Sequence, residues 1–462
     1  MNPTENTSIS RRELGKRVGA VAAATALSGI AIPAVHAAGD STVQVVLVGC
    51  GGRGTGAAAD ALRAKGVHPK LVAMADVFED RLKDSYRNLT GHKDIAGKID
   101  VPDDRKFIGF DAYKHAVDVL KPGDVAIFTT PLAFRWVHFT YAIEKGVNVF
   151  MEKPLTADGV TSKRMLKLAE AAKAKNLKVG VGLMSRHARH LQELQKRITD
   201  GAIGDVLLMR GYRMAGGDVA SFRSLRKPEH MSDLEYQIRR FHSFIWASGG
   251  CYNDYNIHII DHLCWMKNAW PVTAMSTGGR QYKTNAKGEP YVDQNFDSYS
   301  TEYTFADGAK LLFGGRCMDG AEPSYSSHIL GTKGCAIASS SGDCGDPSSL
   351  YTGFSEDKDK KVWHSADHTN PYQNEWDELM DAIVNNKPYN EVERGVYASL
   401  TGSMGRASAH IGKQISFEEM LNSEHEFTPG IATWTSASPS PVPSDADGMY
   451  PKPEPGKKSR EW

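Results

Sequence analysis

A glycine-rich turn between an apolar segment and an alanine-rich segment constrains the fold of this chain more than any other feature. The stretch TVQVVLVGCGGRGTGAAADALRAKG, residues 42–66, is typical of a buried strand, a tight turn and a helix. Gly49, Gly51 and Gly54 give the spacing G-x-G-x-x-G where the strand ends. Glycines there permit the turn and let the backbone approach a pyrophosphate, which the N-terminus of the following helix stabilises.

A carboxylate ends the second predicted strand of this unit. The strand KLVAMAD finishes at Asp76, 22 residues after Gly54. An acidic side chain at this point can accept hydrogen bonds from both ribose hydroxyls of an adenosine and repels a 2′-phosphate. The unit therefore predicts a dinucleotide cofactor, with NAD favoured over NADP.

Strand and helix patterns continue to alternate after this unit. Residues 124–131, 147–154 and 177–184 are typical of strands, and residues 134–146 and 161–176 of helices. Such alternation predicts an α/β fold with a parallel sheet, whose ligands bind beyond the carboxyl ends of the strands. The predicted cofactor-binding residues at the glycine turn and these strand ends are Gly49, Cys50, Gly51, Gly52, Arg53, Gly54, Asp76, Arg81, Thr129, Thr130, Pro131, Glu152 and Lys153.

Several short motifs follow one another in a specific order. After the glycine turn come TTP at 129–131, EKP at 152–154 and IHIIDH at 257–262. Together they resemble the Gfo/Idh/MocA family of glucose–fructose oxidoreductases and inositol dehydrogenases, over nearly all of residues 42–422. The resemblance implies an N-terminal Rossmann domain and a C-terminal α/β domain. In this family the second domain has a large, mostly antiparallel open sheet that often builds dimers or tetramers.

Lys153 stands at the carboxyl end of a predicted strand, ahead of Pro154. Oxidation of an alcohol removes the hydroxyl proton, and a cation near that oxygen stabilises the developing alkoxide. The resemblance implies that this lysine contacts both the nicotinamide ribose and the substrate, and that the bond before the proline is often cis. A surface lysine in a turn is the alternative from the residues alone.

A second group of candidate catalytic residues lies in SGGCYNDYNIHIIDHLCWM. Asp254 and His258 are four residues apart, so on a helix they share one face. The resemblance implies that His258 is a general base, and Asp254 can orient it or bind a substrate hydroxyl. A helix-capping aspartate and a buried, satisfied histidine are the alternative. His242 and His262 stay unassigned.

Some residues depart from the family pattern or allow two interpretations. Arg135 stands where many relatives carry histidine, and it can reach a phosphate or carboxylate or cover a helix end. Arg186 and His187 can supply sugar contacts or belong to a basic surface patch. In the polar and aromatic segment before the second group, Tyr236 and Trp246 suit either a sugar ring or a hydrophobic core.

The two ends of the chain differ in composition from the rest. Near its N-terminus the chain has SRRELGK at residues 10–16, followed by an apolar run and by small residues near position 38. Together these features resemble a Tat leader. The resemblance predicts export to the periplasm and excludes residues 1–38 from the fold. We expect a Rossmann domain at 40–184, a substrate and oligomerisation domain at 185–425, and a Pro/Ser-rich tail at 426–462 that is disordered or lies over the surface as a strap.

Net charge and cysteine content exclude several classes of function. The formal net charge is zero, which favours neither nucleic acid nor an acidic membrane as partner. Six cysteines without a CxxC pair predict no metal site and no disulfide scaffold, although an oxidising compartment still allows one or two bridges.

These observations predict an exported enzyme that folds around NAD before it crosses the membrane. The favoured function is an NAD-dependent oxidoreductase with tightly bound cofactor, acting on a secondary hydroxyl of a sugar, polyol or sugar derivative. The alternative is an NAD-dependent glycoside hydrolase or lyase that oxidises its substrate transiently and then eliminates the leaving group. A non-catalytic binding protein is the third possibility, and the intact Lys153, Asp254 and His258 argue against it.

Overall fold

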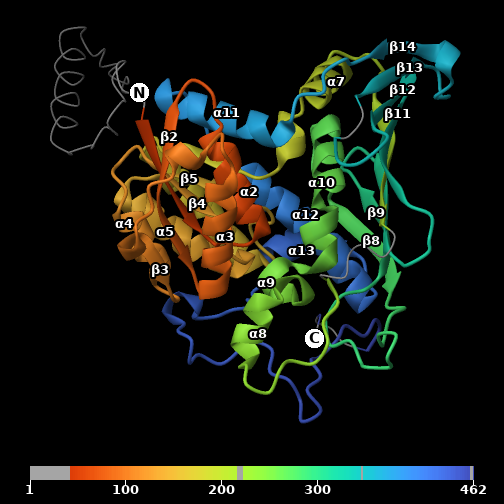
Figure 1. Ribbon diagram of the computed structural model, residues 1–462. Coiled ribbons are helices and arrows are strands. Elements are labelled where there is room, and N and C mark those ends of the chain that lie inside the picture. The colour runs from red at the N-terminus through yellow and green to blue at the C-terminus, as the bar shows by residue number, and fades with distance from the viewer. Residues whose placement is uncertain (1–41, 216–221, 345–346, 458–460, 462) are drawn as a thin grey trace, which may run out of the picture.

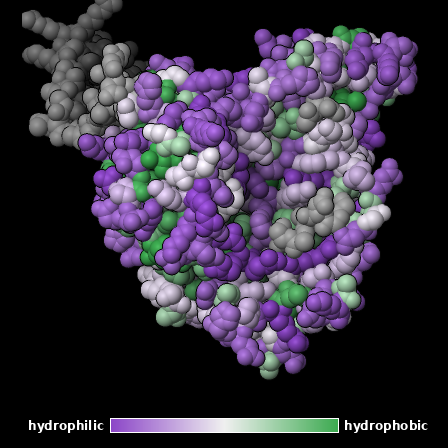
Figure 2. Space-filling model, in the orientation of Figure 1, coloured by the Kyte–Doolittle hydropathy of each residue, from purple (hydrophilic) through white to green (hydrophobic). Residues whose placement is uncertain are grey.

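The computed structural model describes residues 42–215, 222–344, 347–457 and 461, so the predicted leader lies outside the described residues. In Figure 1 the parallel sheet and its helices form the left part of the molecule, and the mostly antiparallel sheet stands upright on the right. Figure 2 shows that the same face is largely hydrophilic and is hollowed between these two parts.

The first sheet is parallel, in the order β3-β2-β1-β4-β5-β6. Its strands are β1 (Thr42–Val48), β2 (His68–Asp76), β3 (Lys106–Ile108), β4 (Val125–Phe128), β5 (Asn148–Met151) and β6 (Val179–Val181). The helices between them are α2 (Gly52–Leu62), α3 (Glu79–Gly91), α4 (Ala112–Asp118), α5 (Arg135–Lys145) and α6 (Gly159–Ala174). Separate hydrophobic cores cover its two faces, so β4 and β5 are buried throughout and apolar except for Asn148. The predicted parallel α/β sheet is confirmed.

The second sheet is mostly antiparallel, in the order β14-β13-β12-β11-β7-β10-β9-β8-β15, with β7 and β10 parallel to each other. Its strands are β7 (Val206–Ala215), β8 (Thr273–Gly279), β9 (Ser298–Thr304), β10 (Lys310–Cys317), β11 (Ser324–Gly331), β12 (Gly334–Ser339), β13 (Ser349–Thr352), β14 (Lys361–His364) and β15 (Ile415–Ser416). The helices α7 (Arg189–Thr199) and α10 (Gly250–Lys267) pack against it. The predicted antiparallel sheet is therefore confirmed.

Two late helices return to the first sheet. In α11 (Pro371–Val384), Trp376 and Leu379 join the core under β1 and α2. In α12 (Val392–Ile411), Val396 joins the core on the opposite face. The two sheets are thus tied together by more than the single crossing between β6 and α7.

The segment after α13 (Phe417–Asn422) lies over the protein as a strap (dark blue in Figure 1). Val442 and Tyr450 are buried in a core shared with α8 (Asp233–Arg239) and α9 (Ile245–Ser248). The carboxylate of Glu461 pairs with the fully buried Arg406 at 2.7 Å. Of the two predictions for the tail, the strap agrees with the described residues.

The cysteines and the helices give two further observations. All six cysteines are unbridged, and the Sγ atoms of Cys251 and Cys317 are 3.9 Å apart. Among the described helices, none has the length and apolar character needed to cross a membrane.

Candidate active site

The glycine turn after β1 packs closely against the end of β4. Gly49 has a φ of +95°, a conformation that residues with side chains rarely adopt. A methyl group at Gly54 would lie 2.0 Å from the carbonyl oxygen of Gly49, so only glycine lets α2 start this close to the strand. Methyl groups at Gly51 and Gly52 would meet no described atom within 4 Å. The start of α2 therefore borders open space, which fits an approaching pyrophosphate.

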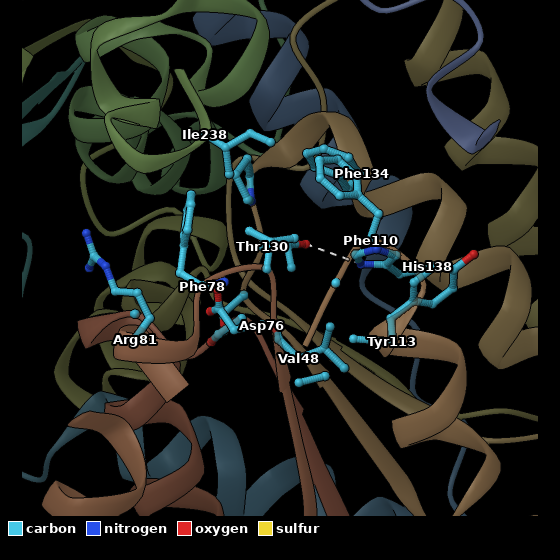
Figure 3. Close-up of a pocket in the computed structure, with 18 of the residues that line it drawn as sticks. Val48, Asp76, Phe78, Arg81, Phe110, Tyr113, Thr130, Phe134, His138 and Ile238 are labelled. Atoms are coloured by element: carbon cyan, nitrogen blue, oxygen red, sulfur yellow. Dashed lines mark hydrogen bonds between the residues drawn. The ribbon is translucent and has the colours of Figure 1, made fainter. Parts of the chain in front are cut away.

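Asp76 lies beside this turn at the end of β2. Its carboxylate accepts hydrogen bonds from the backbone N–H groups of Cys50 (2.6 Å) and Phe78 (2.9 Å). Burial raises the pKa of Asp76 above its ordinary value, and the two N–H groups and the nearby Arg81 oppose that shift. Figure 3 shows Asp76, Phe78 and Arg81 together at the pocket wall, where ribose hydroxyls can reach the carboxylate.

Two adjoining pockets form one groove along the carboxyl ends of the first sheet. The first pocket contains Asp76 and Phe110, and the second contains Glu152 and Lys153. The residues that line both pockets are Gly51, Arg81, Thr129, Thr130, Arg239 and Phe241. With the exception of Cys50, every predicted cofactor-binding residue lines this groove.

Side chains at the ends of β4 and β5 hold the groove in shape. The Thr129 hydroxyl donates to the carbonyl oxygen of Gly49 (2.5 Å), which ties β4 to the glycine turn. The Arg53 guanidinium pairs with the buried Glu152 carboxylate at 2.8 Å. Since Arg53 comes from the start of α2 and Glu152 from the end of β5, this pair connects the turn to the EKP motif.

Lys153 and Asp254 meet in the second pocket although they are 101 residues apart. The Lys153 Nζ donates to the Asp254 carbonyl oxygen (2.6 Å) and to its Oδ1 (3.2 Å), and the Lys153–Pro154 peptide bond is cis. The other carboxylate oxygen of Asp254 is 2.7 Å from Nδ1 of His242. Burial alone would raise the pKa of Asp254, but Lys153 and His242 hold it well below its ordinary value.

His258 lies one helical turn beyond Asp254 in α10, and it is buried. It lines neither of the two pockets, and its Nδ1 has no hydrogen-bond partner among the described residues. Burial, followed by the positive charges of Lys153 and Arg213, lowers the pKa of His258 well below its ordinary value, so the imidazole is neutral. The structure therefore brings Lys153 and Asp254 to the groove, while His258 is buried one helical turn further along α10.

Arg135 has a structural role. Its guanidinium is buried and donates to the backbone carbonyl oxygens of Thr130 (2.7 Å) and Glu152. Burial lowers its pKa to about 10, so the group stays charged at neutral pH. Because these N–H groups bind backbone carbonyl oxygens just after β4 and β5, Arg135 holds the ends of the two strands together in the groove wall.

Arg186 and His187 are not part of a basic surface patch, and that interpretation is wrong. Arg186 makes two 2.8 Å hydrogen bonds to the buried Asp261. His187 lies between Glu378 (2.6 Å) and Glu391 (3.3 Å). Both side chains form ion pairs with carboxylates from other parts of the chain, and these carboxylates compensate the cost of removing the cations from water.

Tyr236 and Trp246 belong to the hydrophobic core. Trp246 is fully buried and donates from Nε1 to Gln237 (2.7 Å), while Tyr236 packs against Tyr450 of the strap. Of their two interpretations, the core therefore agrees with the structure.

The segment before α10 covers part of the groove. Arg239 makes a two-pronged ion pair with Asp80 (2.8 and 3.0 Å) and stacks on Phe78, and it lines both pockets. The strap holds this segment in place, because Tyr450 donates to Asp233 (2.7 Å) and Gln237 donates to the Val442 carbonyl oxygen (2.6 Å). The sequence suggested two roles for aromatic residues of this segment, a sugar contact or a core position, and assigned none to Arg239.

Parts of the chain are similar in sequence to curated inositol dehydrogenases. No family model matches it. It is 31% identical over 148 residues to inositol 2-dehydrogenase 4 of Saccharopolyspora erythraea, covering 30% of this chain and 43% of that protein. It is 29% identical over 141 residues to inositol 2-dehydrogenase/D-chiro-inositol 3-dehydrogenase of Halalkalibacterium halodurans, covering 30% of this chain and 36% of that protein. The matches thus span less than half the length of these curated relatives.

Solved structures match over most of the chain. Levoglucosan dehydrogenase in complex with NADH and levoglucosan has a TM-score of 0.60 at 19% identity, covering 81% of this chain and 99% of that one. An oxidoreductase domain protein from Kribbella flavida has a TM-score of 0.63 at 17% identity, covering 82% and 99%. The chain has the fold of Gfo/Idh/MocA-type oxidoreductases. The two-sheet architecture implied by the resemblance is confirmed.

Proposed function

We propose that this protein oxidises a secondary hydroxyl group of a sugar or polyol with NAD as the redox cofactor. The observation that carries the proposal is the position of Lys153, whose ammonium group is held by Asp254 in the same groove as the glycine turn. The similar proteins support it, because they are named as dehydrogenases of inositol and levoglucosan and one was solved with NADH.

The groove residues fit a dinucleotide. Backbone N–H groups at Gly51 and Gly52 would hold the pyrophosphate at the start of α2, where the space is open. Asp76 would bind the adenosine ribose, and its negative charge disfavours the 2′-phosphate of NADP. When bound, the nicotinamide supplies a two-electron acceptor for the hydrogen on the reacting carbon.

Lys153 would contact the reacting hydroxyl from the far end of the groove. Its positive charge stabilises negative charge that develops on the oxygen as the proton leaves. Asp254 fixes the ammonium group through two contacts in a partly buried place. His258, one helical turn after Asp254 in α10, completes the predicted catalytic set as a neutral imidazole.

We further propose that the cofactor stays bound between turnovers. Arg239 and Phe241 cover the nucleotide groove, and the Arg239–Asp80 pair closes it from the side. The strap anchors this cover through Asp233 and Gln237. A retained cofactor agrees with the Tat-like leader, which would export the protein folded around NAD to the periplasm.

We also propose a homo-oligomer that forms through the open sheet. Met275 of β8 and Leu312 of β10 are 51% and 40% exposed. Both lie opposite Glu302 of β9, so they share one row across the same sheet face. Exposed apolar residues in such a row suit a contact with a second copy.

The proposed function is tested on protein purified from the exported fraction. Nucleotide released by acid should be NAD(H) by mass, in about one equivalent per chain. Addition of myo-inositol or levoglucosan should produce absorbance at the wavelength of reduced nicotinamide. Recovery of nucleotide-free protein that takes up NADP in preference to NAD would contradict the cofactor assignment, and absence of reduction by any sugar would contradict the activity.

A further inference from the structure

Two of the six cysteines lie together where α10 meets the second sheet. Cys251 is in the first turn of α10, and Cys317 is the last residue of β10, 66 residues later in the chain. Their Sγ atoms are 3.9 Å apart, close enough for one thiol to donate a hydrogen bond to the other. The helix packs against the sheet here (Figure 1). The fold therefore brings two thiols from distant parts of the chain into contact.

One short segment, residues 295–297 just before β9, holds the backbones of both cysteines. The Cys251 N–H donates to the side-chain oxygen of Asn295 (2.7 Å), and the Cys317 N–H donates to the carbonyl oxygen of Asp297 (2.8 Å). On the other side, Arg223 donates to the Cys317 carbonyl oxygen (2.7 Å). The two thiols are thus kept side by side by contacts that do not involve sulfur.

A bond between the two sulfurs requires only a small movement. The S–S distance in a disulfide is about 2.0 Å, so each sulfur has to approach the other by about 1 Å from their 3.9 Å separation. Rotation of each side chain about its Cα–Cβ bond moves the sulfur while the backbone stays in place. Phe222 and Tyr255 pack around the pair, and an apolar disulfide fits these surroundings.

Cys317 is the better nucleophile of the two. It is 8% exposed, whereas Cys251 is 3% exposed. The hydrogen bond with Cys251 lowers the pKa of Cys317 below its ordinary value, and while burial opposes this shift, the positive charge of Arg223 supports it. A lowered pKa matters because the thiolate, and not the thiol, attacks a disulfide.

We propose that Cys251 and Cys317 form a disulfide bond in an oxidising compartment and that this bond ties the first turn of α10 to the end of β10. The oxidant is a small disulfide such as oxidised glutathione. The Cys317 thiolate attacks one of its sulfurs and releases one glutathione thiol, and Cys251 then attacks the mixed disulfide and releases the second. The two cysteines lose two protons and two electrons, and the two released glutathione molecules carry both away as thiols.

The bond would act on the helix that carries Asp254. Cys251 and Asp254 are three residues apart in α10, so they are neighbours on its surface. A link from Cys251 to the sheet restrains the helical turn whose carboxylate holds Lys153. The export proposed above would carry the folded protein from a reducing to an oxidising compartment, so the bond would form after folding.

The first test is a map of the disulfides in the wild-type protein. Reduced protein is freed of reductant and incubated with oxidised glutathione, in urea just below the unfolding transition so that local opening admits the oxidant to buried thiols. Remaining thiols are then alkylated in denaturant, and the protein is digested without reductant for mass spectrometry. We expect the Cys251 peptide to be linked to the Cys317 peptide and the other four cysteines to be alkylated.

Alkylation of all six cysteines, or a link that joins either residue to another cysteine, would overturn the inference. Neither nucleotide nor sugar enters this experiment. Its outcome is therefore independent of the proposed function, and an inactive enzyme that forms the bond would overturn only the latter.

The second test compares alanine variants in both redox states. Cys251→Ala and Cys317→Ala each remove one partner, and Cys264→Ala is the control, because Cys264 is a buried cysteine of the same helix. A bond between residues 66 positions apart restricts the unfolded chain, so the oxidised wild type and oxidised Cys264→Ala should unfold at higher urea concentrations than their reduced forms. The other two variants should unfold at one urea concentration in both states. Equal values for the oxidised and reduced wild type would overturn the inference, since the bond would then not fit the folded protein.

Discussion

Replacing Gly52 and Gly54 by alanine, one at a time, should separate two uses of glycine in the turn after β1. At Gly52 a methyl group would meet no described atom within 4 Å, so the nucleotide-free protein has room for it. Alanine is also favoured over glycine in a helix by about 0.5–1 kcal/mol. We expect the free energy of unfolding of Gly52→Ala to stay unchanged or rise by up to about 1 kcal/mol.

The same methyl group should weaken nucleotide binding. It would occupy the space that the pyrophosphate needs at the start of α2. A steric conflict of about 1–3 kcal/mol corresponds to roughly a ten- to hundredfold loss of affinity. Titration calorimetry of the stripped protein with NAD measures this loss directly.

Gly54→Ala should act on the fold itself. Its methyl group would lie 2.0 Å from the Gly49 carbonyl oxygen and 2.4 Å from the Thr129 hydroxyl, and the first of these is backbone that cannot move aside. We expect destabilisation of about 1–3 kcal/mol or more in urea unfolding of the stripped protein. The reasoning is refuted if Gly52→Ala binds NAD as the wild type does, or if Gly54→Ala unfolds at the wild-type urea concentration.

Three further changes have distinct expected results. Asp76→Ala should weaken NAD retention and reduce discrimination against NADP, measured by competition for the stripped protein, because the repulsive carboxylate is gone. Lys153→Ala should keep its nucleotide and slow single-turnover reduction by roughly two to four powers of ten; a rate within about threefold of wild type would exclude alkoxide stabilisation. Burial alone would lower the pKa of His187, but Glu391 and Glu378 raise it to about 9. The charged form of His187 therefore adds to the free energy of unfolding, and this contribution is complete below about pH 6.5 and is lost as the pH rises through about 9. In urea unfolding, the wild type should lose this free energy over that pH range, and His187→Gln should not.

The parts of the structure that follow from local patterns were predictable from the sequence. The glycine turn, the alternation of β1, α2 and β2, and Gly146 at the end of α5 depend on neighbouring residues, and the structure has them where the sequence predicts. A strand that is buried on both faces of a parallel sheet has a continuous apolar run, which is easy to recognise in the sequence.

Contacts between distant segments were harder to predict. The contact between Lys153 and Asp254 spans 101 residues and depends on how two sheets are joined. Arg135 binds backbone carbonyl oxygens, which any residue type can provide, so the sequence left open whether it contacts a ligand or covers a helix end. His242 stands in a segment without periodicity, and its only sequence signal was a polar and aromatic composition shared by many loops.

One short segment contributes both to the cover over the nucleotide groove and to the contacts around Lys153 and Asp254. Arg239 reaches Asp80 on the nucleotide side, and three residues later His242 reaches Asp254 on the side of Lys153. The strap holds the start of this segment at Asp233. Since a few residues cannot move independently, any motion that opens the groove at Arg239 also displaces His242. Cofactor release and loss of the His242–Asp254 contact beside Lys153 would then be one event, which favours a cofactor that stays bound while this contact is intact.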